Sequence, residues 1–128
     1  MAAYNRGCLE LNGRLMGRLT THILDTAHGG PAAGVDVRLY ACGEHREQVA
    51  FATTNEDGRT PRPLLDAESG GTFELEFDVG DYFRARGVQL AEPAFLDTVV
   101  IRFAVSAGED YHVPLLVSPW SYSTYRGS

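Results

Sequence analysis

The stretch GTFELEFDV, residues 71–79, alternates apolar and acidic side chains along most of its length. Three apolar residues, Phe73, Leu75 and Phe77, fall on one face of an extended chain, and the glutamates between them fall on the other. Successive side chains of a β-strand point to opposite faces of a sheet. This period of two therefore predicts a strand that buries its apolar face and exposes its acidic face.

Short segments of the same kind follow one another along the rest of the chain, separated by turns. VDVRLY (35–40) alternates strictly, and the Asp-Gly pair in NEDGR (55–59) marks a turn. AHGGPAAG (27–34) is also expected to be a turn outside any ladder, because proline donates no backbone hydrogen bond. Further strands are expected at residues 18–25, 47–54, 97–105, 111–117 and 121–126.

Proline and glycine refine this pattern in two places. Pro114 lies within 111–117 and predicts that this strand is at a sheet edge or a bulge. GDYFRARG (80–87) breaks the alternation and predicts a short helix, capped by Asp81 and ended at Gly87. Seven or eight short strands, about eight to twelve residues apart, together with one short helix predict an all-β sandwich or barrel.

Composition and charge exclude several classes of protein. The chain has 128 residues, of which 44% are hydrophobic, as is typical of one globular domain. Its net charge of −6 argues against nucleic acid or an anionic membrane surface as a partner, because both attract basic proteins. All 11 basic residues are arginine, so chemistry that needs a lysine, such as a Schiff base or a P-loop, is excluded.

The N-terminal residues differ from the rest of the chain. Residues 1–17 have no clear period and are interpreted as a flexible N-terminal extension, followed by a single domain at 18–128. Met16 lies just before the first clear strand and is a second candidate start. No apolar run reaches membrane-spanning length, and the first residues lack the apolar core of a secretory signal. We therefore expect a cytoplasmic protein.

Two of the four histidines lie in segments that are expected to be strands. His22 and His112 are flanked by apolar residues, whereas His28 and His45 fall in turns, where exposure to solvent is the simplest interpretation. A strand histidine is either a partly buried structural residue or a general acid–base group, because imidazole titrates near neutral pH. The residues alone leave both interpretations open.

Arg59, directly after the Asp-Gly turn, has two interpretations as well. It is either a solvated loop residue or a clamp for an anion or an oxyanion, to which a planar guanidinium is suited. A zinc site would need a third ligand beside the two histidines, such as Asp25 or another histidine, and the sequence has no HxH or HExxH spacing. It also has no GxSxG nucleophile elbow and no glycine-rich nucleotide loop.

Four motifs carry a resemblance to a known family: LTTHILD (19–25), TTNEDGR (53–59), GDYF (80–83) and YHVPLLVSPWSYSTYRGS (111–128). In this order and at these spacings they resemble the transthyretin-like family of 5-hydroxyisourate hydrolases. The terminal YRGS is the most specific motif, because it separates the hydrolases from transthyretin, the hormone carrier of the same fold. The resemblance implies an all-β, transthyretin-like sandwich of two four-stranded sheets with one short helix.

The resemblance also implies a reaction and a site. Such an enzyme adds water across a ring amide of 5-hydroxyisourate, the unstable product of urate oxidation, and forms 2-oxo-4-hydroxy-4-carboxy-5-ureidoimidazoline without a cofactor or a metal. The catalytic positions of the family fall on His22, Arg59, His112 and Ser128, and Tyr125 is expected to line the pocket. Two imidazoles can supply base and acid, and Arg59 can bind the developing negative charge.

The family further implies a homotetramer, a dimer of dimers, with active sites at the dimer–dimer interface. The tail STYRGS (123–128) is then expected to dock there and to form part of the pocket wall. Trp120 and Ser121 depart from the family pattern, which has a smaller aromatic residue and often glycine at these positions. The alternatives are a transthyretin-like carrier of a small aromatic ligand, against which the two histidines argue, and a structural or adhesive sandwich domain.

Overall fold

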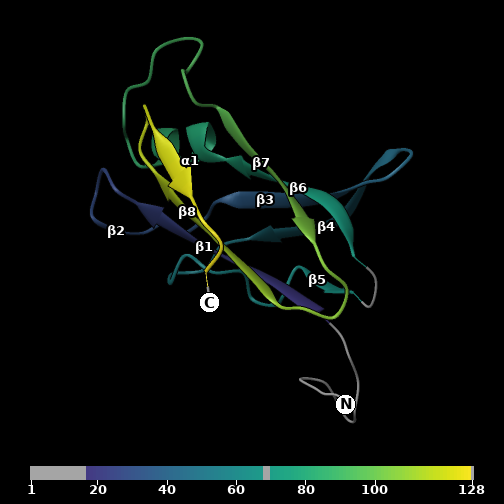
Figure 1. Ribbon diagram of the computed structural model, residues 1–128. Helices are drawn as coiled ribbons and strands as arrows, with labels where there is room; N and C mark the ends of the chain where they lie inside the picture. The colour runs from purple at the N-terminus through teal and green to yellow at the C-terminus, as the bar shows by residue number, and fades with distance from the viewer. Residues whose placement is uncertain (1–16, 68–69, 128) are drawn as a thin grey trace.

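The computed structural model describes residues 17–67 and 70–127, which form two β-sheets packed face to face with one short helix beside them (Figure 1). The first sheet has the strand order β2-β1-β8-β9, and β5 pairs with the opposite end of β1 from β2. The second sheet has the order β4-β3-β6-β7. The bounds are β1 Gly17–Asp25, β2 Gly30–Pro31, β3 Asp36–Cys42, β4 Arg46–Thr53, β5 Leu65–Ala67, β6 Gly71–Asp78, α1 Val79–Ala85, β7 Thr98–Val105, β8 Tyr111–Val117 and β9 Tyr122–Thr124.

Strand β6, in the interior of the second sheet, has the alternation that the sequence predicts. Phe73, Leu75 and Phe77 are at most 7% exposed and belong to the core between the sheets. On the opposite face, Glu74 accepts a hydrogen bond of 2.9 Å from Arg46 of β4. The apolar face therefore supplies one half of the core, and basic side chains of neighbouring strands neutralise the acidic face.

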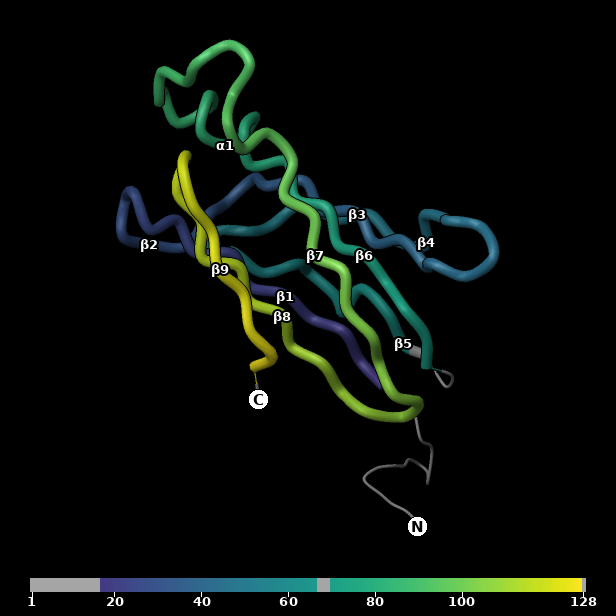
Figure 2. The backbone as a smooth tube through the Cα atoms, turned by 45° about the horizontal axis from the view of Figure 1, so that its top comes forward, coloured from purple at the N-terminus to yellow at the C-terminus, as the bar shows by residue number. Residues whose placement is uncertain are grey.

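The first sheet supplies the other half of the core through β1 and β8. Leu19 and Ile23 of β1 and Leu115 of β8 are at most 1% exposed, and they pack against the side chains of the second sheet. Figure 2 shows β1, β8 and β9 running together as one layer, with β3, β6 and β7 forming the other. Alternate residues of β1 and β8 thus face the core, and the residues between them are available for other roles.

Pro114 predicted either a sheet edge or a bulge for β8, and neither is found: β8 lies between β1 and β9, and its pairing with both strands has no register shift. It pairs in parallel with β1 along its whole length, and His22 lies opposite Pro114. Regular pairing with β9 covers Leu115 to Val117, which are the residues directly after Pro114, and Leu115 lies opposite Thr124. An interior strand accommodates Pro114 because the ladder to β9 stops at this point.

The first sheet has five strands, so the prediction of two four-stranded sheets holds for the second sheet only. Gly30 and Pro31, which were expected in a turn outside any ladder, pair with Asp25 and Leu24 as β2. Strand β2 ends its sheet, where a proline is tolerated. Strand β5, in a segment for which no strand was expected, extends the sheet at the other end of β1.

The predicted helix forms, but its start differs from the prediction. Asp78, and not Asp81, occupies the N-cap position of α1, and its side chain makes no capping hydrogen bond. The carboxylate of Asp78 instead accepts two hydrogen bonds from Arg38, at 2.8 and 2.6 Å. Gly87 follows the helix with a φ of +85°, as expected for its end. Across the described ranges no helix has the length and the apolar character to span a membrane.

A buried carboxylate connects α1 to β1. Asp25 is 1% exposed and accepts hydrogen bonds from the Tyr82 hydroxyl at 2.7 Å and from the backbone N–H groups of Ala27 and His28 at 2.9 and 3.0 Å. His28 Nδ1 lies 2.6 Å from the same carboxylate. Burial by itself would raise the pKa of Asp25, but the hydrogen bonds from Tyr82 and His28 lower it below its ordinary value. The charged form of Asp25 therefore stabilises the fold.

We expect Asp25→Asn to lower the free energy of unfolding at neutral pH by about 1–3 kcal/mol, the usual cost of disrupting buried hydrogen bonds to a charged group. Because the folded pKa is lowered, the contribution of Asp25 is complete at neutral pH and is lost as the pH falls through that pKa. Denaturant unfolding at a series of pH values from neutral to acidic measures this. Asp81→Asn is the control, because that carboxylate is 79% exposed; equal losses in the two variants would contradict the assignment.

Candidate active site

The two strand histidines come together because β1 and β8 are neighbours in the first sheet. The strands pair in parallel with Thr20 opposite His112, and His22 lies one alternation further along the same face. Ile23 and Val113, which adjoin the two histidines in sequence, are buried in the core. Both imidazoles therefore lie on the outer face of the sheet, where each residue is half-buried.

The Asp-Gly turn brings Arg59 to the same place. The Ile23 N–H donates a 2.8 Å hydrogen bond to the Gly58 carbonyl, and a backbone bridge pairs His22 with Arg59. Gly58 has a φ of +76°, and a Cβ at this position would lie 2.5 Å from the Ile23 carbonyl oxygen. Only glycine permits both the left-handed turn and the close approach to β1. The turn thereby places Arg59 beside His22.

The end of the chain docks against β8. Strand β9 pairs antiparallel with β8, and further along the Gly127 N–H donates a 2.7 Å hydrogen bond to the His112 carbonyl. A Cβ on Gly127 would lie 2.7 Å from Cδ2 of the His112 ring, so the bare Cα of the glycine packs against the imidazole. The tail is therefore in contact with the site in its own chain. The predicted catalytic residue Ser128 lies outside the described residues.

The charges around His112 favour its neutral form. Burial, the Arg59 guanidinium and His22 together lower the pKa of His112 below that of an ordinary histidine. A neutral imidazole can accept a proton from water, whereas an imidazolium cannot. Near neutral pH, His112 is consequently in the protonation state that a general base requires.

Two further residues belong to this place that the sequence did not indicate. The Thr20 hydroxyl lies 2.9 Å from His112 Nδ1. Arg62 and Arg59 line one hollow of about 160 Å³, to which Thr20 and Thr60 contribute hydroxyl-bearing side chains. Sequence reasoning missed Thr20 because its importance depends on the pairing of β1 with β8, and it missed Arg62 because an arginine in a proline-rich loop has no distinguishing pattern.

Asp25 makes its hydrogen bonds away from the two strand histidines. Asp25, one candidate for the third ligand of a zinc site, is buried, and its carboxylate is held by Tyr82 and His28. In the part of the chain that the structure describes, no three His, Cys, Asp or Glu side chains are grouped as metal ligands.

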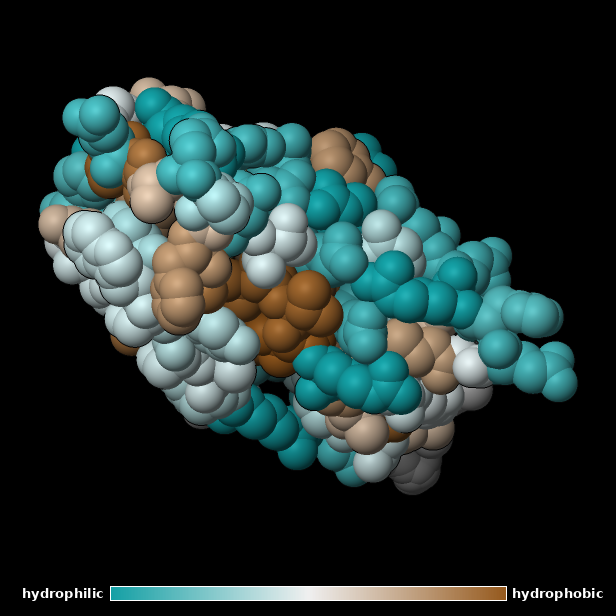
Figure 3. All heavy atoms as spheres, turned by 90° about the horizontal axis from the view of Figure 1, so that it is seen from above, coloured by the Kyte–Doolittle hydropathy of each residue, from teal (hydrophilic) through white to brown (hydrophobic). Residues whose placement is uncertain are grey.

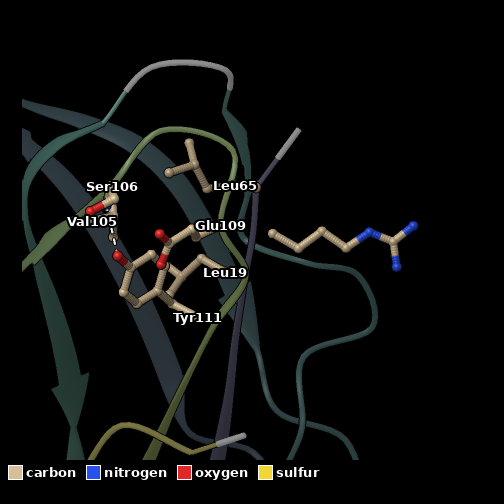
Figure 4. A pocket seen from close by; sticks show the side chains of 8 residues that line it. Leu19, Leu65, Val105, Ser106, Glu109 and Tyr111 are labelled. Carbon is tan, nitrogen blue, oxygen red and sulfur yellow. Dashed lines mark hydrogen bonds between the residues drawn. The ribbon is translucent and has the colours of Figure 1, made fainter. Parts of the chain in front are cut away.

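Another hollow lies at the far end of β1 and is unsuited to a substrate. Leu19, Leu65 and Tyr111 converge on it, and the Tyr111 hydroxyl accepts a 2.7 Å hydrogen bond from the Ser106 N–H (Figure 4). Its volume of about 10 Å³ is about what one water molecule needs. This hollow is a small gap in the packing, and the outer face with its two histidines is the better candidate.

Known proteins with similar sequences and structures identify the family of this chain. The profile of the "HIUase/Transthyretin family" matches residues 19–127. A 5-hydroxyisourate hydrolase of Pseudomonas aeruginosa is 57% identical over 117 residues, which cover 88% of this chain and 93% of that protein.

Solved structures agree with this match. The structure of Klebsiella pneumoniae 5-hydroxyisourate hydrolase aligns with a TM-score of 0.75 at 34% identity and covers 88% of this chain and 100% of that chain. An (S)-allantoin synthase aligns with a TM-score of 0.83 at 42% identity, over 88% of this chain but 44% of that longer chain. Transthyretin structures have the same fold, which confirms the predicted fold class. The chain belongs to the HIUase/transthyretin family.

Proposed function

We propose that this chain hydrolyses 5-hydroxyisourate in urate degradation, the activity that the names of its relatives state. The observation that carries the proposal is the meeting of two imidazoles and one guanidinium on the outer face of a sheet, at the point where the tail docks. Hydrolysis of a cyclic amide needs a base, an acid and an oxyanion partner, and these three groups supply those functions.

In the proposed reaction, water adds across a ring amide of the substrate. His112 accepts a proton from water at Nε2, and the resulting hydroxide attacks the carbonyl carbon. Arg59 stabilises the tetrahedral oxyanion, and His22 protonates the leaving nitrogen as the C–N bond breaks. A proton then passes from His112 through solvent to His22, which restores both groups. The lowered pKa of His112 supports its assignment as the base.

Groups in these roles make large contributions to the rate of a reaction. A positioned acid or base typically accelerates a reaction by about 10²–10⁴-fold. A single oxyanion partner contributes about 10²–10³-fold. Ser128 and Tyr125 stay predictions for substrate binding, supported by the contact between Gly127 and the His112 ring. We propose that the reaction uses neither a cofactor nor a metal, and the cytoplasmic location also stays a prediction.

We also propose that the chain acts as a homotetramer, a dimer of dimers. Three aromatic residues near the tail, Trp120, Tyr122 and Tyr125, are 71%, 44% and 61% exposed. Within the described residues, strands β7 and β9 each form an unpaired edge of their sheet. Open edges and exposed aromatic groups are typical of surfaces that another subunit covers. Seen from above, the surface also has apolar atoms in a hollow among polar ones (Figure 3).

We expect His112→Asn to lower kcat/KM by about 10²–10⁴-fold, because the variant cannot accept the proton from water. In the wild-type enzyme the rate should fall as the pH drops through the lowered pKa of His112. The assay lets uricase form 5-hydroxyisourate from urate and follows its ultraviolet absorbance against spontaneous decay. The control is His45→Asn, at an exposed position between β3 and β4. A wild-type protein that binds the compound without faster decay would favour the carrier instead.

We expect Gly127→Ala to lower kcat/KM by about 10²-fold, the size of effect that a small displacement of a reacting group can have. The added methyl would lie 2.7 Å from Cδ2 of His112, so either the imidazole or the tail must move. Gly43→Ala is the matched control, because nothing lies within 4 Å of a Cβ at that position. An unchanged rate in Gly127→Ala would show that the contact of the tail with His112 has no role in turnover.

Residues added after Ser128 should reduce activity far more than the same residues added before Met1. The reason is that Ser128 directly follows Gly127, whose N–H is bonded to the His112 carbonyl, so an extension must begin one residue from this contact. Steady-state rates and light scattering on both fusion proteins measure activity and assembly together. Equal activity of the two fusions would refute the docked tail as part of the site.

A further inference from the structure

The outer face of the first sheet contains a hydroxyl that the proposed reaction does not yet use. Thr20 and His112 are directly opposite each other on parallel strands, so their side chains leave the sheet side by side. Thr20 Oγ1 lies 2.9 Å from Nδ1 of His112, a hydrogen-bond distance between two half-buried groups. The residues that make this contact are 92 positions apart in sequence.

We propose that Thr20 is a positioning residue for His112: its hydroxyl oxygen accepts the hydrogen bond from Nδ1–H and leaves Nε2 as the proton acceptor. A neutral imidazole has one protonated and one bare nitrogen, and the partner of one nitrogen decides which is which. This inference rests on the proposed function, because it is the base role of His112 that requires a bare nitrogen directed at water.

The direction of this hydrogen bond follows from the two states that a base must pass through. Once Nε2 has accepted a proton, both ring nitrogens of His112 carry hydrogens and can only donate. The Thr20 oxygen can accept from Nδ1–H both before and after that step. If the hydroxyl donated to Nδ1 instead, the neutral ring would carry its hydrogen on Nε2, and His112 could not take a proton from water at that atom.

A second contact fixes the other edge of the ring. The backbone of Gly127 packs against Cδ2 of His112 closely enough that a Cβ there would lie 2.7 Å away. The imidazole is thus held between a hydroxyl of β1 and the backbone of the tail. Both contacts limit the rotation of the ring, and so the direction in which Nε2 can point.

A hydroxyl suits this position better than a carboxylate. Among the described residues, Arg59, from the turn after β4, and His22, from β1, are the charged and titratable neighbours of His112, and with burial they lower its pKa. A carboxylate beside Nδ1 would attract the imidazolium and raise the pKa. Thr20 accepts the same hydrogen bond without a charge, so it orients the ring while leaving His112 neutral and ready to act as a base.

The test compares Thr20→Val, which keeps the shape but removes the hydroxyl, with Thr20→Ser, which restores it. We expect Thr20→Val to lower kcat/KM by up to about 10²-fold, the size of effect that a small misplacement of a reacting group can have. The acid limb of its pH profile should move to lower pH, because the imidazolium loses its acceptor. Thr20→Ser should recover both the rate and the pH profile.

The matched control is Thr26→Val. The Thr26 hydroxyl also bonds to a β8 residue, but it donates, to the Val117 carbonyl at 3.1 Å, and among the described residues it makes no hydrogen bond to either strand histidine. Thr26→Val should therefore keep the wild-type rate and pH profile. If the two valine variants lose activity equally, or if Thr20→Val keeps the wild-type pH profile, Thr20 has only a structural role and the inference is wrong.

A spectroscopic measurement separates this inference from the proposed function. Nitrogen-15 NMR of wild-type His112, assigned by its loss in His112→Asn, reports which ring nitrogen carries the hydrogen. We expect Nδ1–H in wild type and a shift towards Nε2–H in Thr20→Val; Nε2–H in wild type would overturn the inference, even if Thr20→Val does not fold. Nδ1–H in a protein that does not accelerate decay of 5-hydroxyisourate would support the contact and refute the proposed function.

Discussion

The parallel pairing of β1 with β8 is the constraint on which both the core and the site depend. Side chains alternate between the faces of a sheet, so a slip of one residue would turn every side chain of a strand to the other face. Ile23 and Leu115 would then leave the core, and the two histidines would enter it. The apolar residues that specify the register therefore also specify the separation of His22 and His112, although they take no part in the chemistry.

Two other segments reach this pair of strands in the same physical way. The turn at Gly58 and the tail at Gly127 each join the sheet by a backbone hydrogen bond, and each approaches so closely that a Cβ would collide. Because glycine has no side chain, the backbone can approach the Ile23 carbonyl at Gly58 and the His112 ring at Gly127. The site is consequently assembled from a sheet, a turn and the end of the chain, and the backbone supplies the accuracy with which the side chains are placed.

The sequence predicted those features that depend on local pattern. The alternation in β6 and the two strand histidines were visible in a few adjacent residues, and the order of the motifs revealed the family. The features that were missed depend on contacts between segments that are far apart in the sequence. Pro114 argued for a sheet edge or a bulge, but whether a neighbour covers β8 is decided by β1 and β9. The Thr20–His112 contact likewise exists only once strands distant in sequence are paired.

The outer face of the first sheet explains how one fold can serve both a carrier and an enzyme. The core residues of this chain would support either function, because they fix only the two sheets, and transthyretins have the same fold. The half-buried groups on the outer face are different, since burial and the nearby Arg59 disfavour the charged form of His112. A site that only binds a ligand gains nothing from a histidine whose charged form is disfavoured. A site that must take a proton from water gains a neutral imidazole near physiological pH. The burial and the nearby positive charge that disfavour the imidazolium of His112 are therefore what hydrolysis needs.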